Sequence, residues 1–196
     1  MERNIVGGNI KWRQKRWSIG ATGLYYKYDH ILTPNNQPYN ILRTRDRSDN
    51  YDLSVDYKVK FRNIHLAGEF AKSADAGFAM VNHAQIHANS RLSFSLVQRH
   101  YTPEYNADFA NAFGESSRNQ NESGVFLGAD LLPYLYIHLR GYVDVYRFDW
   151  LRYQVGEPSE GSDCMVMMDI GFGVNKKLTA KYRKHTKFQT DYSKHV

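Results

Sequence analysis

The residues best suited to chemistry in this chain are histidines and carboxylates that recur at every second position. His83 and His87, with Gln85 between them, have the spacing of one face of a β-strand. A zinc ion needs several such ligands converging on one point. A strand rises roughly 3.3 Å per residue, which puts these two histidines about 13 Å apart along the backbone. The spacing therefore favours a row of polar side chains over a metal site.

Acidic and basic side chains also recur at every second position elsewhere in the chain. The ten polar residues that we expect to line a lumen are Asp52, Asp56, Lys58, Glu69, His83, His87, Asp130, His138, Arg140 and Asp144. Two neighbouring carboxylates could act as general acid and base. In a narrow barrel, however, mixed acids and bases neutralise one another and line the interior. We therefore predict a polar lumen with no catalytic residue, no metal ligand and no cofactor.

Strict alternation identifies the elements that hold these side chains as strands. From Tyr51 to Phe61 every odd position is apolar or aromatic and every even position is polar, and Leu135 to Val145 nearly repeats the pattern. A helix would spread the charges around its circumference, whereas a strand puts them on one face. The pattern predicts ten strands, at residues 8–13, 16–28, 50–61, 64–72, 78–89, 92–101, 123–132, 135–147, 163–172 and 178–188.

The connections between these strands are expected to alternate between short and long. Short turns are predicted at Lys15, Arg62-Asn63, Ser90-Arg91, Pro133-Tyr134 and Asn175-Lys176-Lys177, and longer connections near 29–49, 73–77, 102–122 and 148–162. Transmembrane barrels have tight turns on one side of the membrane and long loops on the other. All five prolines are predicted to lie in connections, because proline cannot donate to a strand ladder. One short helical turn is expected within 102–122.

The composition is polar overall and yet rich in aromatic residues. Aromatic residues make up 14% of the chain, charged residues make up 23%, and the mean hydropathy is −0.62. No apolar run approaches the roughly 20 residues of a membrane-spanning helix. Rings are expected in girdles at the two membrane interfaces. The long-loop girdle would comprise Tyr25, Tyr26, Tyr28, Tyr51, Tyr101, Tyr146, Phe148 and Trp150, and the short-turn girdle would comprise Trp17, Phe61, Tyr134 and Tyr136.

These patterns predict an all-β fold. We expect an antiparallel up-and-down meander of about ten strands that forms a complete or incomplete transmembrane-type β-barrel. Residues 1–196 would be a single domain. The chain begins at Met1 without a basic segment followed by an apolar one, and it ends in a polar stretch. An outer-membrane protein must be exported, so we expect this domain to be a fragment of a longer protein.

Two stretches resemble a known family. They run from His100 to Gly128 and from Tyr146 to Tyr153. They are similar to the C-terminal strand-rich region of helix-hairpin-helix domain-containing proteins of Bacteroidota, and the resemblance covers residues 16–188. It implies an outer-membrane barrel that follows small DNA-binding modules. The helix-hairpin-helix motif is not present in this sequence, so any contact with DNA would belong to regions outside this chain.

The expected function is passive transport or anchoring rather than catalysis. We predict a porin-like module of the bacterial cell outer membrane, in contact with its lipid, that acts as a channel or as a membrane anchor and scaffold. Two alternatives stay open. A soluble up-and-down barrel that binds a small apolar ligand would turn its apolar face inward. A barrel enzyme acting on lipid would need a serine and a histidine in contact on the lipid-facing side.

Overall fold

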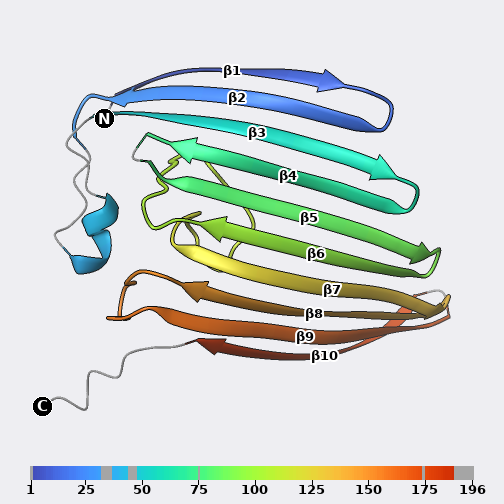
Figure 1. The fold of residues 1–196 in the computed structure, drawn as a ribbon. Coiled ribbons are helices and arrows are strands. Elements are labelled where there is room, and N and C mark those ends of the chain that lie inside the picture. The colour runs from blue at the N-terminus through green and yellow to red at the C-terminus, as the bar shows by residue number, and fades with distance from the viewer. Residues whose placement is uncertain (1, 32–36, 44–47, 75, 174, 188–196) are drawn as a thin grey trace, which may run out of the picture.

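Ten strands form one antiparallel sheet in which each strand pairs with the next along the chain (Figure 1). The structure is a computed structural model that describes residues 2–31, 37–43, 48–74, 76–173 and 175–187. The strands are β1 (Arg3–Arg13), β2 (Trp17–Tyr28), β3 (Asp49–Phe61), β4 (Ile64–Ser73), β5 (Phe78–Asn89), β6 (Leu92–Tyr101), β7 (Glu122–Tyr134), β8 (Ile137–Phe148), β9 (Ser159–Phe172) and β10 (Lys176–Lys187). The predicted all-β meander is confirmed.

The sheet is open between its two edge strands. The strand order begins at β1 and ends at β10, and each of these strands pairs on one side only. All residues of both strands are exposed. The fold is therefore barrel-like but incomplete, with one gap in its wall.

The pairing register gives the sheet one apolar and one polar face. Val55 on β3 lies opposite Ala21 on β2 and Phe70 on β4, whereas the next residue, Asp56, lies opposite Gly20 and Glu69. Directly opposed residues of an antiparallel pair put their side chains on the same face. The period-two pattern of each strand therefore continues across the whole sheet. Each strand exposes large side chains on the apolar face, for example Ile10, Ile19, Val55, Leu66, Ile86, Leu96, Leu127, Val143, Val166 and Leu178.

Most predicted strand ends lie within two residues of the observed ones, and two differ by more than that. β1 begins at Arg3 and β9 begins at Ser159, both earlier than predicted. β7 continues through Pro133 to Tyr134, and the turn follows at 135–136 instead of at the proline. The register of β7 against β8 shifts at this point. A register shift of this kind marks a β-bulge, where a strand residue need not donate its N–H to the neighbouring strand. Proline has no N–H, so the strand tolerates it at this position.

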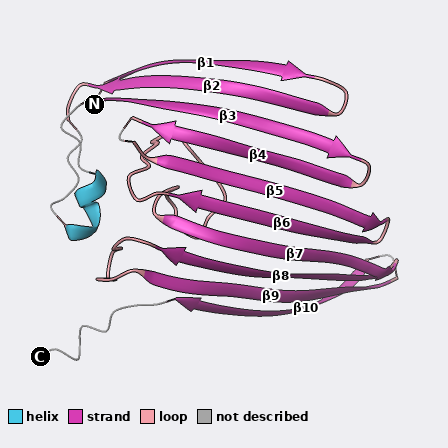
Figure 2. Cartoon of the chain, viewed as in Figure 1, coloured by secondary structure: helices cyan, strands magenta, loops and turns pink. Residues whose placement is uncertain are grey.

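The remaining connections correct one further prediction. Residues 102–121 contain no helix, and the short helix of the described chain is η1 (Pro38–Arg43), in the connection between β2 and β3 (Figure 2). Pro38 begins this helix, Pro103 and Pro158 lie in connections as predicted, and Pro34 lies outside the described residues. No helix in the described part of the chain is long and apolar enough to cross a membrane.

Short turns gather at one end of the sheet and longer connections at the other (Figure 1). The short turns are residues 14–16, 62–63, 90–91, 135–136 and 173–175. The other end carries 102–121 and 149–158, and β1 begins and β10 ends there in Figure 1. The predicted asymmetry is therefore present, and it divides each strand into a short-turn half and a long-loop half.

Candidate functional site

The connection between β6 and β7 crosses the polar face of the sheet, and we call residues 102–121 the cross-face loop. Its two ends belong to neighbouring strands, but its middle reaches the far edge. The side-chain amide of Asn50 on β3 donates to the carbonyl of Asn106 at 2.8 Å. The guanidinium of Arg3 on β1 lies 5.2 Å from the centre of the Phe109 ring. The loop therefore spans the polar face from β6 to β1.

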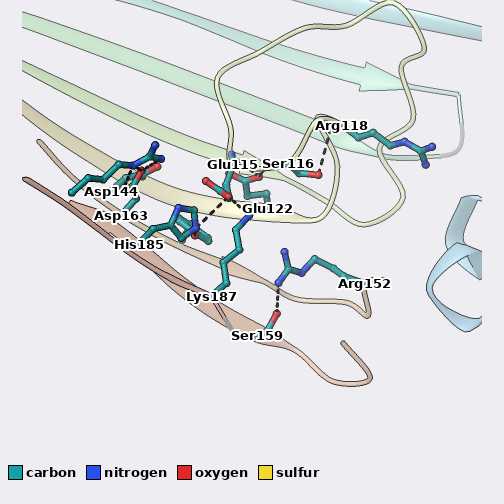
Figure 3. A network of polar contacts seen from close by, with 12 residues as sticks. Glu115, Ser116, Arg118, Glu122, Asp144, Arg152, Ser159, Asp163, His185 and Lys187 are labelled. Atoms are coloured by element: carbon teal, nitrogen blue, oxygen red, sulfur yellow. Dashed lines mark hydrogen bonds and ion pairs between the residues drawn. The ribbon is translucent and has the colours of Figure 1, made fainter. Parts of the chain in front are cut away.

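The same loop also contacts the opposite edge of the sheet. Glu115 forms an ion pair with Lys187 on β10, and its carboxylate lies 3.6 Å from the Nε2 atom of His185 (Figure 3). Lys187 and His185 share the polar face of β10, since they lie opposite Gly161 and Asp163. One loop can contact the polar side of both edge strands only if the sheet curves around it. The polar face is therefore the inner, concave face.

An apolar cluster holds the loop against the sheet. Tyr105 is 4% exposed and packs with Ala79 of β5 and Tyr101 of β6. Gly77 lies directly beneath it, because a Cβ atom at that position would be 2.2 Å from the Cα of Tyr105. Small residues of the sheet thus leave room for the backbone of the loop. Alanines complete this contact, namely Ala71, Ala107 and Ala112.

A buried arginine lies where the cross-face loop joins β6 and β7. The side chain of Arg99 is fully buried. Its Nε donates to Glu122 at 2.5 Å, and its two terminal nitrogens donate to the two oxygens of Asp144 at 2.8 and 3.1 Å. Gly124 makes space for it, since a Cβ there would lie 2.6 Å from the guanidinium carbon. Bidentate pairing of this kind fixes the direction of the guanidinium as well as its position.

Glu122 connects this buried network to the loop backbone. Its carboxylate accepts hydrogen bonds from the N–H groups of Glu115, at 2.8 Å, and of Ser116, at 2.9 Å (Figure 3). The rings of Phe113 and Tyr146 lie near the guanidinium, with centroids 5.2 and 5.9 Å from its carbon. Charged groups buried this deeply are tolerated only when hydrogen bonds satisfy them. The network therefore fixes where the loop leaves the sheet and turns inward.

All ten polar residues that the sequence predicts for one surface lie on the inner face: Asp52, Asp56, Lys58, Glu69, His83, His87, Asp130, His138, Arg140 and Asp144. They do not form one cluster. Asp144 belongs to the buried network, whereas Asp130 pairs with His138 at 2.8 Å and Arg140 pairs with Asp169 at 2.5 Å. No group of three or more metal-binding side chains occurs among the described residues.

Several inner-face residues were missed, although alternation alone could have found them. Arg99 and Glu122 form the buried network, Lys11 pairs with Asp56 at 2.6 Å, and Asp163 pairs with Arg183 at 2.6 Å. Each lies on the polar face that the alternation and the strand register define. Burial and the approach of the loop are what distinguish Arg99 and Glu122, and neither is visible in a local pattern.

The long-loop girdle is wrong for most of its rings. Tyr26, Tyr101 and Phe148 are buried on the inner face, where they fill the space near the cross-face loop. Of the tyrosines predicted for this girdle, all of which the structure describes, only Tyr25 and Tyr51 expose their rings on the apolar face. The short-turn rings agree better with the prediction, because they are exposed on or next to the apolar face: Trp17, Phe61, Tyr134 and Tyr136.

A serine and a histidine meet on the apolar face near the long loops. The Nδ1 atom of His100 lies 2.7 Å from the Oγ of Ser123. Both residues point away from the inner face, because His100 lies opposite Met80 and Ser123 lies opposite Arg147. The contact has the geometry of a base beside a nucleophile. A third group that would orient the imidazole is not found among its described hydrogen bonds and ion pairs.

No protein-family model, no curated protein and no solved structure matches this chain. Its function therefore has to be inferred from its own residues.

Proposed function

We propose that this chain forms part of the wall of an outer-membrane β-barrel, and that its polar lumen is a passive channel narrowed by the cross-face loop. One observation carries the proposal. The loop lies on the polar face, so the apolar face is directed outward on all ten strands. Soluble monomers rarely expose contiguous apolar patches larger than a few hundred Å². A hydrocarbon environment removes the cost of that exposure.

Strand length supports the same proposal. The strands have 10 to 14 residues, and roughly 9 to 11 tilted residues cross a bilayer. The interior argues against a soluble barrel that binds an apolar ligand, because Arg99, Glu122 and Asp144 are buried there. The resemblance to helix-hairpin-helix proteins and any contact with DNA through regions outside this chain stay predictions.

Site-directed labelling tests the outward direction of the apolar face. Single cysteines are introduced as Val55→Cys and Ser54→Cys in a Cys164→Ser background, and the proteins are inserted into lipid vesicles. Val55 lies on the apolar face and Ser54 on the inner face of β3, and both choices leave the Lys11–Asp56 ion pair intact. We expect Val55→Cys to react only with a lipid-soluble maleimide and Ser54→Cys to react with a water-soluble one. Reaction of both variants with the water-soluble reagent would contradict a membrane location.

Planar-bilayer recording separates a channel from a closed anchor. If ions pass through the lumen, the inserted protein produces discrete conductance steps. Deletion of residues 106–114 removes the middle of the cross-face loop, and the steps should become larger. The labelling experiment above could place the protein in the membrane while no conductance is seen with or without this deletion. In that case the barrel would be an anchor or scaffold instead of a channel.

The serine–histidine contact favours a lipid hydrolase as the second candidate. In this reaction the Oγ of Ser123 attacks an ester carbonyl while His100 takes its proton and then delivers it to the leaving alcohol. Water next cleaves the acyl-serine and releases the fatty acid. The vesicle-inserted protein is incubated with phospholipid, and release of fatty acid is compared with that of the Ser123→Ala variant. Equal release by the two proteins would exclude this role.

A further inference from the structure

A cavity of about 380 Å³ opens on the short-turn half of the inner face. It lies at the ends of β1 to β5, away from the cross-face loop. The residues around it include five that carry a permanent positive charge: Arg13, Lys15, Arg16, Lys58 and Lys60. No aspartate or glutamate lines it. A recess lined by charges of one sign concentrates counter-ions.

The register explains why this part of the lumen is hollow. Lys58 on β3 lies opposite Ser18 on β2 and Ala67 on β4, and Ala67 in turn lies opposite His83 on β5. Small side chains therefore flank the lysine on both sides. One position along the same face, Lys60 lies opposite His65. Lys58 and Lys60 line this space together with residues 13–16 at the turn between β1 and β2.

These cations contrast with inner-face cations such as Lys11, Arg140 and Arg183, each of which has a carboxylate partner. Lys11, the next inward residue of β1 before Arg13, forms an ion pair with Asp56 at 2.6 Å. None of the five cations around the cavity forms an ion pair with a carboxylate among the described residues. Five like charges around one space repel each other, and a bound anion would relieve that repulsion.

We propose that this cavity is a binding site for a compact polyvalent oxyanion of the phosphate class. Lysine and arginine donate strong, charge-assisted hydrogen bonds to phosphoryl oxygens. The volume lies at the lower end of the range of about 300 to 1,000 Å³ that is usual for small-ligand sites. Several phosphoryl groups in one molecule would match several cations at once, so polyvalent anions bind here more tightly than monovalent ones. The site requires neither a membrane nor a conducting pore.

Calorimetric titration with inorganic tripolyphosphate tests the site on the full chain folded in detergent micelles. The protein is compared with Lys58→Gln, Lys60→Gln and the double variant, which remove the charge but keep a polar, slightly shorter side chain. The matched control is Lys181→Gln. Lys181 is also an exposed inner-face lysine, on β10, without a carboxylate partner in the described chain, but it does not line the cavity.

We expect one tripolyphosphate per chain and an affinity about tenfold weaker in each single variant, because one charge-assisted hydrogen bond corresponds to roughly that factor. Lys181→Gln should bind like the parent, and circular dichroism should show the same strand content in all variants. The site is disproved if the parent does not bind tripolyphosphate at low salt, if the double variant binds as well as the parent, or if Lys181→Gln loses as much affinity as Lys58→Gln. Because the titration is done in micelles, its outcome is independent of the labelling and conductance results.

Discussion

The long-loop half and the short-turn half of the inner face follow the same alternation, but they differ in how their charges are used. Under the cross-face loop, the side chains of Arg99 and Glu122 are both fully buried and bonded to each other. At the short-turn end, His138 and Asp130 are within hydrogen-bond distance of each other, with side chains 31% and 43% exposed. Lys58 and Lys60 have no acidic partner among the described residues. Burial by the loop therefore decides which charges hold the structure and which face the lumen.

The largest effect is expected for Arg99→Met, because it leaves Glu122 and Asp144 buried without a cation. Removing one partner of such a network costs about 3 to 5 kcal/mol. Urea unfolding of the micelle-folded protein measures this loss. Arg147→Met is the control, since Arg147 is exposed and pairs with Asp149 at 3.2 Å, a kind of contact worth at most about 1 kcal/mol. Equal losses in the two variants would show that burial under the loop is not what matters.

A smaller loss is expected for Gly77→Ala, which acts on the loop rather than on a charge. The new methyl group meets the backbone of Tyr105, and overpacking of this kind typically costs about 1 to 3 kcal/mol. Displacement of the loop should raise both the conductance and the rate of proteolysis within 102–121. Gly8→Ala is the matched control, because nothing lies within 4 Å of a Cβ at Gly8. If the two variants behave alike, the loop does not depend on this close approach.

Alkaline pH should loosen the loop through Tyr105. Burial raises the pKa of its phenol above the ordinary value, and the nearby carboxylates of Asp52 and Glu69 raise it further. The neutral phenol is thus favoured in the folded state, so its contribution to stability is complete below about pH 10 and decreases as the pH rises above that value, by at most about 1.4 kcal/mol per pH unit. Unfolding free energies measured across this range should fall less steeply in Tyr105→Phe. The same slope in both proteins would contradict the effect.

The smallest effect is expected for Asp130→Asn, in the open half. Its contact with the Nε2 atom of His138, at 2.8 Å, joins two partly exposed side chains. Loss of such a pair changes the free energy of unfolding by about 1 kcal/mol or less. The same urea titration measures it. A loss as large as that of Arg99→Met would remove the distinction between the two halves.

Strand positions could be predicted from the sequence because alternation is a local property. The strict pattern of Tyr51–Phe61 marks β3 almost to its ends, and two strands, β5 and β6, were predicted with their exact bounds. Pro133 was misplaced because a bulge accommodates proline as well as a turn does. The long-loop girdle failed because a tyrosine that faces lipid and one that packs under a loop look the same in a sequence.

The cross-face loop could not be predicted, although traces of it are present. Residues 102–121 have no periodicity, so nothing in them indicates a direction relative to the sheet. Gly77, Ala79 and Gly124 are small where the loop or the buried arginine approaches. Small residues on a strand have several explanations, however, and they indicate a close approach only once the approaching segment is known.

The sequence by itself determined that the chain forms ten antiparallel strands with one apolar and one polar face, because a period of two puts alternate side chains on opposite sides of any strand. It did not determine which face is inside, since the pattern is the same for a sheet that curves either way. The tertiary structure decided this through one loop that contacts Arg3 on β1 and Lys187 on β10. Curvature depends on contacts between distant residues, and alternation carries no information about them.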